Sequence, residues 1–190
     1  EVPNGDDWLH EIKFDGYRML CFLERGKARL VTRKGNDWTA QFPRVAAAAE
    51  FKPEMCSLNM GSMNFGIFPL AGREREWQFD WEKPYLEASE NAIFPNTFRD
   101  IRRIVEIMGG HGTRFEFECY DVGHLYNLAH FVDEGLVRGP LFIQSIFGIL
   151  GGLGPDPENL VTMRSTADRL FGRAGYRFSV LGAWRHQMPL

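Results

Sequence analysis

Cysteine is scarce in this sequence of 190 residues, which contains only Cys21, Cys56 and Cys119, all far apart. No pair has the Cys-x-x-Cys spacing of a structural zinc site, and an odd, sparse set of thiols does not suit a disulfide framework. Unpaired thiols are typical of a reducing compartment, so we expect a cytoplasmic protein.

Long apolar runs and strong net charge are also missing. No stretch of about 18 apolar residues occurs, so we expect no membrane span. The formal net charge of −3 gives no general electrostatic reason to bind nucleic acid. With 44% hydrophobic and 25% charged residues, the composition is that of an ordinary globular protein of one domain or two small ones.

The first part of the chain shows the alternation of antiparallel strands. Three segments, 8–14, 17–24 and 27–33, alternate apolar and polar residues, and the residues ERG between the last two predict a hairpin turn. Residues 44–50 (RVAAAAE) then predict a short helix that Pro53 prevents from continuing.

The pattern changes between residues 44 and 53, and strands then alternate with amphipathic helices. The expected strands are 54–61, 113–120, 141–148 and 176–183, and the expected helices are 97–110, 122–136 and 158–172. Such alternation predicts an α/β fold with a parallel sheet. In the strand RFEFECY, Glu116 and Glu118 share one face while Phe115, Phe117 and Cys119 share the other. A charged strand face indicates either a polar barrel interior or a solvent-exposed face in some other fold, and the helices that bracket every strand favour the barrel interior.

Two stretches near the start, GDDWLHEIKFDGYRML and ARLVTRKGNDWTAQFP, carry the motif K-x-D-G-x-R from Lys13 to Arg18. Over about residues 2–45 they resemble the start of the nucleotidyltransferase domain of ATP-dependent DNA ligases. The resemblance implies that Lys13 accepts AMP from ATP with Mg²⁺, which requires a neutral amine. It further implies that Glu11 lies beside the adenine, that Arg18 and Arg33 hold phosphates, and that DNA is a partner of this segment alone. The later ligase motifs are absent, so we expect Lys13 to be orphaned, and a plain surface lysine remains the alternative.

Much longer stretches resemble the β-keto acid cleavage enzymes, the family of 3-keto-5-aminohexanoate cleavage enzyme. They are KPEMCSLNMGSMNFG, IFPNTFRDI, GTRFEFECYDVGHLYNLAHFVDEGLV, PLFIQSIFGILGGLGPDPENL, TADRLFG and SVLGAWRHQMPL. The resemblance implies a partial TIM (β/α)₈ barrel of about four β/α units, preceded by a small antiparallel β segment from a nucleotidyltransferase fold. We therefore expect a ligase-like fragment at 1–47 and a partial barrel at 48–190.

That family exchanges a β-keto acid with acetyl-CoA, giving acetoacetate and a new CoA ester, and its Zn²⁺ polarises the keto acid. Active sites of such barrels gather at the carboxyl ends of the strands. That rule and the resemblance select the following residues for substrate binding: Ser57, Asn59, Glu118, Gln144 and Arg185. A buried polar network remains the alternative for Glu118 and Gln144. The glycine-rich loop 148–157 is either a plain turn or a contact for CoA phosphates.

The family's zinc ligands are a His-x-His pair and a late glutamate. This sequence has five histidines and no His-x-His, so we assign no metal ligand. We expect a fragment of the keto acid cleavage enzyme that is inactive as it stands. Two alternatives stay open: a ligase fragment with an adenylated lysine, and a non-catalytic half-barrel that self-associates through open sheet edges.

Overall fold

The computed structural model describes residues 19–24, 27–32, 37, 39–40, 53–73 and 76–183. The chain divides into two compact units, Glu1–Pro53 and Glu54–Leu190. In the first unit, strands β1 (Met19–Glu24) and β2 (Lys27–Thr32) pair antiparallel, with Glu24 opposite Lys27. This pairing confirms the predicted hairpin. The strand expected at 8–14 and the helix expected at 44–50 lie outside the described residues.

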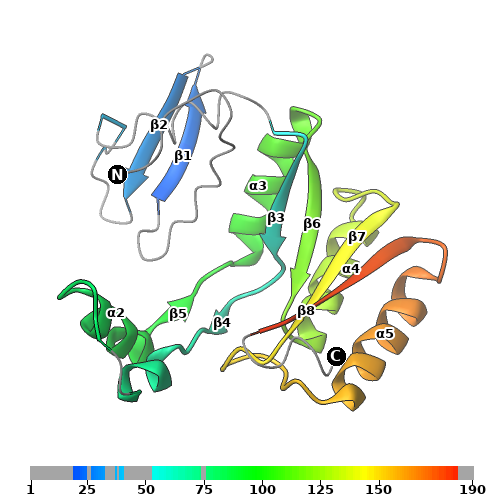
Figure 1. The fold of residues 1–190 in the computed structure, drawn as a ribbon. Helices are drawn as coiled ribbons and strands as arrows, with labels where there is room; N and C mark the ends of the chain where they lie inside the picture. Colours follow the sequence, from blue (N-terminus) through cyan, green and yellow to red (C-terminus); the bar gives the residue numbers. More distant parts are fainter. Residues whose placement is uncertain are drawn as a thin grey trace, which may run out of the picture. The chain divides into compact units, whose positions relative to one another are not determined.

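The second unit is built on a parallel sheet of four strands. The strands are β3 (Met55–Asn59), β6 (Arg114–Cys119), β7 (Leu141–Phe147) and β8 (Tyr176–Gly182), in the order β3-β6-β7-β8. Helices α3 (Phe98–Gly110), α4 (Val122–Asp133) and α5 (Pro157–Phe171) connect consecutive strands (Figure 1). The predicted α/β alternation is therefore confirmed, and the sheet is consistent with part of a barrel.

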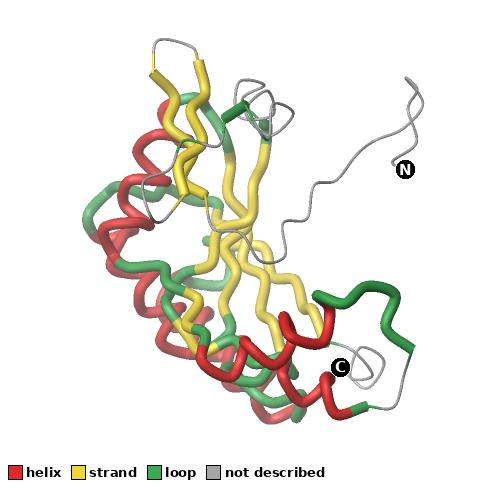
Figure 2. The backbone as a smooth tube through the Cα atoms, turned by 90° about the vertical axis from the view of Figure 1, so that its left-hand side faces the viewer, coloured by secondary structure: helices red, strands yellow, loops and turns green. Residues whose placement is uncertain are grey.

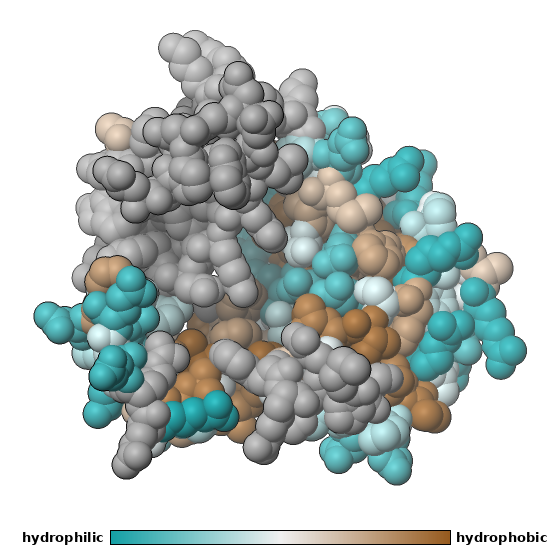
Figure 3. Space-filling model, in the orientation of Figure 1, coloured by the Kyte–Doolittle hydropathy of each residue, from teal (hydrophilic) through white to brown (hydrophobic). Residues whose placement is uncertain are grey.

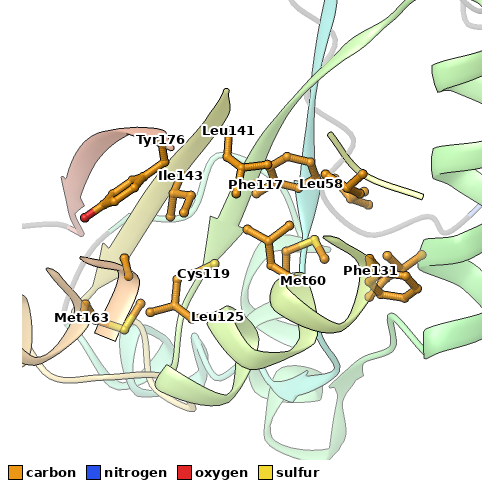
Figure 4. Close-up of a cluster of buried hydrophobic side chains, with 14 of the residues drawn as sticks. Leu58, Met60, Phe117, Cys119, Leu125, Phe131, Leu141, Ile143, Met163 and Tyr176 are labelled. Carbon is orange, nitrogen blue, oxygen red and sulfur yellow. The ribbon is translucent and has the colours of Figure 1, made fainter. Parts of the chain in front are cut away.

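The three connecting helices all lie against one face of this sheet, as Figures 1 and 2 together show. Leu125, Leu128 and Phe131 of α4 are fully buried there. They pack with strand residues such as Phe117 and Ile143 in one continuous cluster (Figure 4). Each large apolar side chain buried in this way contributes about 1.5–3 kcal/mol. The helix-covered face is therefore the hydrophobic core of the unit.

Helix α3 begins where the sequence provides a capping box. The Thr97 hydroxyl accepts from the Asp100 amide at 3.2 Å, and the Asp100 carboxylate accepts from the Thr97 amide at 3.0 Å. These bonds satisfy two donors that a helix start otherwise leaves unpaired. They fix the entry of the chain into the helix that leads to β6.

A long connection between β3 and α3 forms a small two-stranded sheet of its own. It contains β4 (Met63–Asn64), the 3-10 helix η1 (Phe68–Gly72), α2 (Glu82–Ala88), the 3-10 helix η2 (Ser89–Asn91) and β5 (Ile93–Phe94). Strands β4 and β5 pair antiparallel, and the Ser89 hydroxyl accepts from the Ile67 amide at 3.0 Å. None of the described helices has the length and apolar character needed to cross a bilayer.

Candidate functional site

A line of polar side chains crosses the sheet on the face opposite the helices. In register, Asn59 of β3 neighbours Glu118 of β6, Glu118 neighbours Gln144 of β7, and Gln144 neighbours Ser179 of β8. Paired positions on adjacent strands share a face of the sheet. We call these four residues the polar row.

The polar row exists because each strand alternates its side chains. In β6, Phe117 and Cys119 point into the core, which places Glu116 and Glu118 on the other face. Figure 3 views this helix-free face, and hydrophilic and hydrophobic side chains lie side by side on it. The charged face predicted for this strand is therefore present.

Glu118 is the acidic residue of the polar row, and the pKa of its carboxyl group is raised. Burial raises the pKa of its carboxyl group, and the negative charge of Glu116 raises that pKa further. The Tyr120 hydroxyl donates to Glu118 Oε2 at 3.3 Å, which partly offsets the rise in pKa. Glu118 therefore holds a proton at higher pH than an ordinary glutamate, and a protonated carboxyl group can donate a hydrogen bond.

Ser57 lies two residues before Asn59 in β3, on the same face of the sheet, and it neighbours Glu116 of β6. Its hydroxyl donates to Glu116 Oε1 at 3.1 Å. The oxygen of Ser57 keeps its lone pairs for another donor. Its predicted contact with a substrate is not tested by this geometry and stays a prediction.

Two side-chain oxygens of the polar row are buried without a hydrogen-bond partner among the described residues, Asn59 Oδ1 and Ser179 Oγ. Asn59 is 6% exposed, and its backbone carbonyl accepts from Asn96 Nδ2 at 2.7 Å. A buried polar atom without a partner is costly, so such atoms commonly mark a place for a ligand or water. Thr113 Oγ1 and Ser145 Oγ are buried in the same way, so this state is not particular to the polar row.

A recess of about 320 Å³ lies at the carboxyl ends of the strands. The loops after β3, β6 and β7 line it, with Ser62, Asp121, His124, Asn127 and Gly151 among its residues. Burial lowers the pKa of His124, which the Asp121 charge only partly counteracts. The sequence reasoning missed this histidine as a site residue, because its neighbours in the recess come from distant parts of the chain.

The glycine-rich loop after β7 folds as a turn against its neighbours. The Gly66 amide donates to the Leu150 carbonyl at 2.9 Å, and the Leu153 amide donates to the Tyr120 carbonyl at 2.8 Å. Gly151 has φ 109°, and a Cβ there would lie 1.9 Å from the Asn64 carbonyl oxygen. These contacts explain the glycines of this loop by its tight packing, which agrees with the interpretation of the loop as a turn.

A zinc ion needs several His, Cys, Asp or Glu side chains around one point. Within the part of the chain that the structure describes, no group of three or more such residues could hold a metal ion. The described residues therefore do not fit the zinc that the family resemblance implies.

The predicted substrate residues Ser57, Asn59, Glu118 and Gln144 all lie on the helix-free face of the sheet. The fifth, Arg185, lies outside the described residues. So do all residues of the predicted nucleotide site, which are Lys13, Glu11, Arg18 and Arg33. Ser145, the neighbour of Gln144, is fully buried on the helix side and belongs to the core face.

Comparison with known proteins gives matches over most of the chain. The profile of the beta-keto acid cleavage enzyme family matches residues 27–190. The 3,5-dioxohexanoate:acetyl-CoA acetone transferase of Paraburkholderia graminis is 53% identical over 174 residues, covering 89% of this chain and 56% of that protein. The 3-dehydrocarnitine:acetyl-CoA trimethylamine transferase of Rhizobium meliloti is 28% identical over 158 residues, covering 83% of this chain and 44% of that protein. The chain spans about half the length of these curated relatives.

A shorter match covers a quarter of the chain. The multifunctional non-homologous end joining protein LigD of Pseudomonas aeruginosa is 44% identical over 48 residues, covering 25% of this chain and 6% of that protein. The family profile begins at residue 27, inside the segment 1–47 that the sequence predicts to be ligase-like. The family profile therefore overlaps this segment at residues 27–47.

Proposed function

Because the chain belongs to the β-keto acid cleavage enzyme family, we propose that it is the keto-acid-binding part of an acetyl-CoA-dependent transferase. The reaction exchanges a β-keto acid with acetyl-CoA and gives acetoacetate and a CoA ester. The observation that carries this proposal is the 53% identity to the 3,5-dioxohexanoate:acetyl-CoA acetone transferase. We take 3,5-dioxohexanoate, or a keto acid close to it, as the substrate.

The polar row suits such a molecule, which carries one carboxylate and neutral keto oxygens. Asn59 and Gln144 each offer amide donors, and Glu118 in its protonated form offers an O–H to a keto oxygen. The unpartnered Asn59 Oδ1 accepts a hydrogen bond from an enol or hydroxyl group of the ligand. These side chains would hold and orient the keto acid on the helix-free face.

Catalysis needs groups beyond the described residues. Zinc would supply Lewis-acid polarisation of the keto acid in the family, but the described residues do not fit it. We therefore propose that this chain is a fragment that binds substrate without turnover. Dialysed protein is expected to retain no stoichiometric zinc by mass spectrometry and to form no acetoacetate from 3,5-dioxohexanoate and acetyl-CoA. Turnover by the purified chain would refute this part.

Binding is tested separately by calorimetric titration of 3,5-dioxohexanoate. Gln144→Ala removes one amide and is expected to weaken binding about tenfold, the effect of one good hydrogen bond. The matched control is Gln78→Ala, an exposed glutamine on the connection between β3 and α3. If both variants bind 3,5-dioxohexanoate as tightly as the unchanged chain does, Gln144 does not contact the ligand.

The likeness to LigD favours a second candidate function, in which Lys13 accepts AMP. Glu11, Arg18 and Arg33 would then bind ATP with Mg²⁺, and DNA would be the partner of this segment. Attack of the lysine amine on the α-phosphate releases pyrophosphate, so the test is incubation with Mg²⁺ and ATP radiolabelled on the α-phosphate, followed by peptide mapping. A label on Lys13 that disappears in Lys13→Ala supports the candidate, and no label discards it.

A third candidate is a non-catalytic half-barrel that pairs with a second copy. Among the described residues, β8 has a strand partner only on its β7 side. A groove of about 420 Å³ runs beside it between α5 and β8, where Val161 is 65% exposed. Unpaired strand edges and exposed apolar side chains favour association. Light scattering tests this candidate, because a strictly monomeric mass would refute it.

A further inference from the structure

The recess at the carboxyl ends of the strands contains a histidine whose tautomer the fold determines. The Tyr120 amide donates to His124 Nδ1 at 3.2 Å. A nitrogen that accepts a hydrogen bond carries no proton, so the neutral imidazole carries its proton on Nε2. Burial keeps the ring neutral by lowering its pKa. His124 therefore presents an N–H donor at Nε2.

This donor has no acceptor in the described part of the chain. His124 is 5% exposed, its only hydrogen bond there is the one at Nδ1, and its ring lines the recess. The ring edge that carries Nε2 lies beside Gly61, where a Cβ would come within 2.6 Å. Nε2 is not among the fully buried polar atoms that lack a partner, so it opens into the recess, where a ligand oxygen can accept its hydrogen bond.

The other groups of the recess complement this donor. Ser62 Oγ accepts from the Asn96 amide at 2.9 Å, which leaves the hydroxyl hydrogen free to donate. Asn127 donates its Nδ2 to the Met60 carbonyl at 2.8 Å, which leaves Oδ1 free to accept. The recess thus offers two donors for a carbonyl oxygen and an acceptor for an N–H.

The charge of the recess is unsuited to phosphate. Asp121 lines it, and its carboxylate already accepts from the Gly123 amide at 2.8 Å at the start of α4. The negative charge of the Asp121 carboxylate repels a second anion placed beside it. The ligand group is therefore neutral, with both a carbonyl oxygen and an N–H.

We propose that the recess is a subsite for a neutral secondary amide, and that in this chain the group is one of the two amides of the pantetheine arm of CoA. This identification rests on the proposed function, in which acetyl-CoA is the second substrate. His124 Nε2–H and the Ser62 hydroxyl hold the amide oxygen, and Asn127 Oδ1 accepts the amide N–H. The keto acid occupies the polar row, so the two ligands are held by different side chains.

The test uses the whole chain with pantetheine as the probe and adenosine 3′,5′-bisphosphate, the amide-free end of CoA, as the contrast. His124→Asn keeps an acceptor for the Tyr120 amide, because asparagine Oδ1 mimics Nδ1, but removes the Nε2 donor. His130→Asn is the matched control, since His130 lies on the same helix with its side chain 49% exposed. Ser62→Ala removes the second donor independently.

His124→Asn and Ser62→Ala are each expected to raise the pantetheine dissociation constant about tenfold, whereas His130→Asn leaves it unchanged. Pantetheine, but not the bisphosphate, is expected to shift the ¹⁵N resonance of His124 Nε2. The affinity for 3,5-dioxohexanoate stays the same in all three variants.

Unchanged pantetheine affinity in the folded variants, or a His124 resonance that does not move, would overturn the subsite. If His124→Asn does not fold, the pantetheine affinity of Ser62→Ala and the ¹⁵N resonance of His124 in the unchanged chain decide whether the subsite exists. Keto acid binding without pantetheine binding refutes the subsite and leaves the keto-acid site standing. Binding of neither ligand refutes both.

Discussion

Replacing Gly61 with alanine places a methyl group against the His124 ring. The added Cβ would lie 2.6 Å from both Cδ2 and Nε2 of His124 and 3.0 Å from Asn127 Nδ2. Carbon atoms normally approach to about 3.5–4.0 Å, so the overlap with the ring is about 1 Å. The ring cannot simply retreat, because its Nδ1 is held by the Tyr120 amide and Asn127 is held by the Met60 carbonyl.

Overpacking of this kind costs about 1–3 kcal/mol. Gly61 does not have a positive φ, so the backbone itself tolerates alanine and would gain about 0.4–1 kcal/mol from reduced chain entropy. We therefore expect Gly61→Ala to lower the free energy of unfolding by about 1–2 kcal/mol. Urea titration followed by circular dichroism measures this change.

Two further variants separate the steric cause from a general effect of alanine. Gly110→Ala lies at the end of α3, where the new Cβ would have no atom within 4 Å beyond the neighbouring helix backbone, and it is expected to be neutral or slightly stabilising. In a double-mutant cycle, His124→Ala removes the larger obstacle and leaves only the 3.0 Å approach to Asn127 Nδ2, so Gly61→Ala should cost much less in that background. Equal stability of Gly61→Ala and Gly110→Ala, or an undiminished cost in the double mutant, would refute the reasoning.

Three other changes test the packing, the helix start and the acid of the polar row. Phe131→Ala leaves a cavity under α4 and should cost about 3–5 kcal/mol in urea titration, whereas truncation of the exposed Ile107 should cost far less. Thr97→Ala breaks the capping box of α3 and should cost about 1 kcal/mol by the same measurement. Because the pKa of Glu118 is raised in the folded protein, its ionised form opposes folding, and stability falls as pH rises from the ordinary glutamate pKa through the raised one. Glu118→Gln should therefore stabilise the protein above that window and not below it, and a variant less stable than the unchanged chain at neutral pH would contradict this.

The β/α alternation of the second unit could be predicted from sequence to within a few residues. The helix expected at 97–110 is observed at Phe98–Gly110, and the strand expected at 113–120 is observed at Arg114–Cys119. These elements are long, strongly periodic and bounded by glycines or capping residues, so local signals suffice for them.

The connection between β3 and α3 was not predictable in the same way. Its strands β4 and β5 have two residues each, and α2 has seven. Elements this short have no period to detect. They are held by contacts across the sequence, such as the bond from the Ile67 amide to the Ser89 hydroxyl.

The candidate site likewise contains residues that local sequence patterns could place and residues that they could not. Alternation within β6 was enough to place Glu118 on a polar face, but Ser179 joins the polar row only through the register of β8 with β7. The contact between Gly61 and His124 joins residues far apart in the sequence. No local sequence pattern predicts this contact, because the contact depends on how the end of β3 and the start of α4 come together. The roles predicted for Ser57, Asn59, Glu118, Gln144 and Arg185 remain predictions.

The turn after β7 is interlocked with the two loops beside it. Gly151 fits against the Asn64 carbonyl, Leu150 bridges to Gly66, and Leu153 binds the Tyr120 carbonyl. In barrel enzymes the loops at this edge determine substrate specificity, and single loops can often be exchanged while the rest of the fold stays constant. Here the loops after β3, β6 and β7 would have to vary together. Directed evolution of substrate specificity would therefore need libraries that mutate these three loops together. A graft of one loop alone would misfold, because the contacts with the other two loops would be broken.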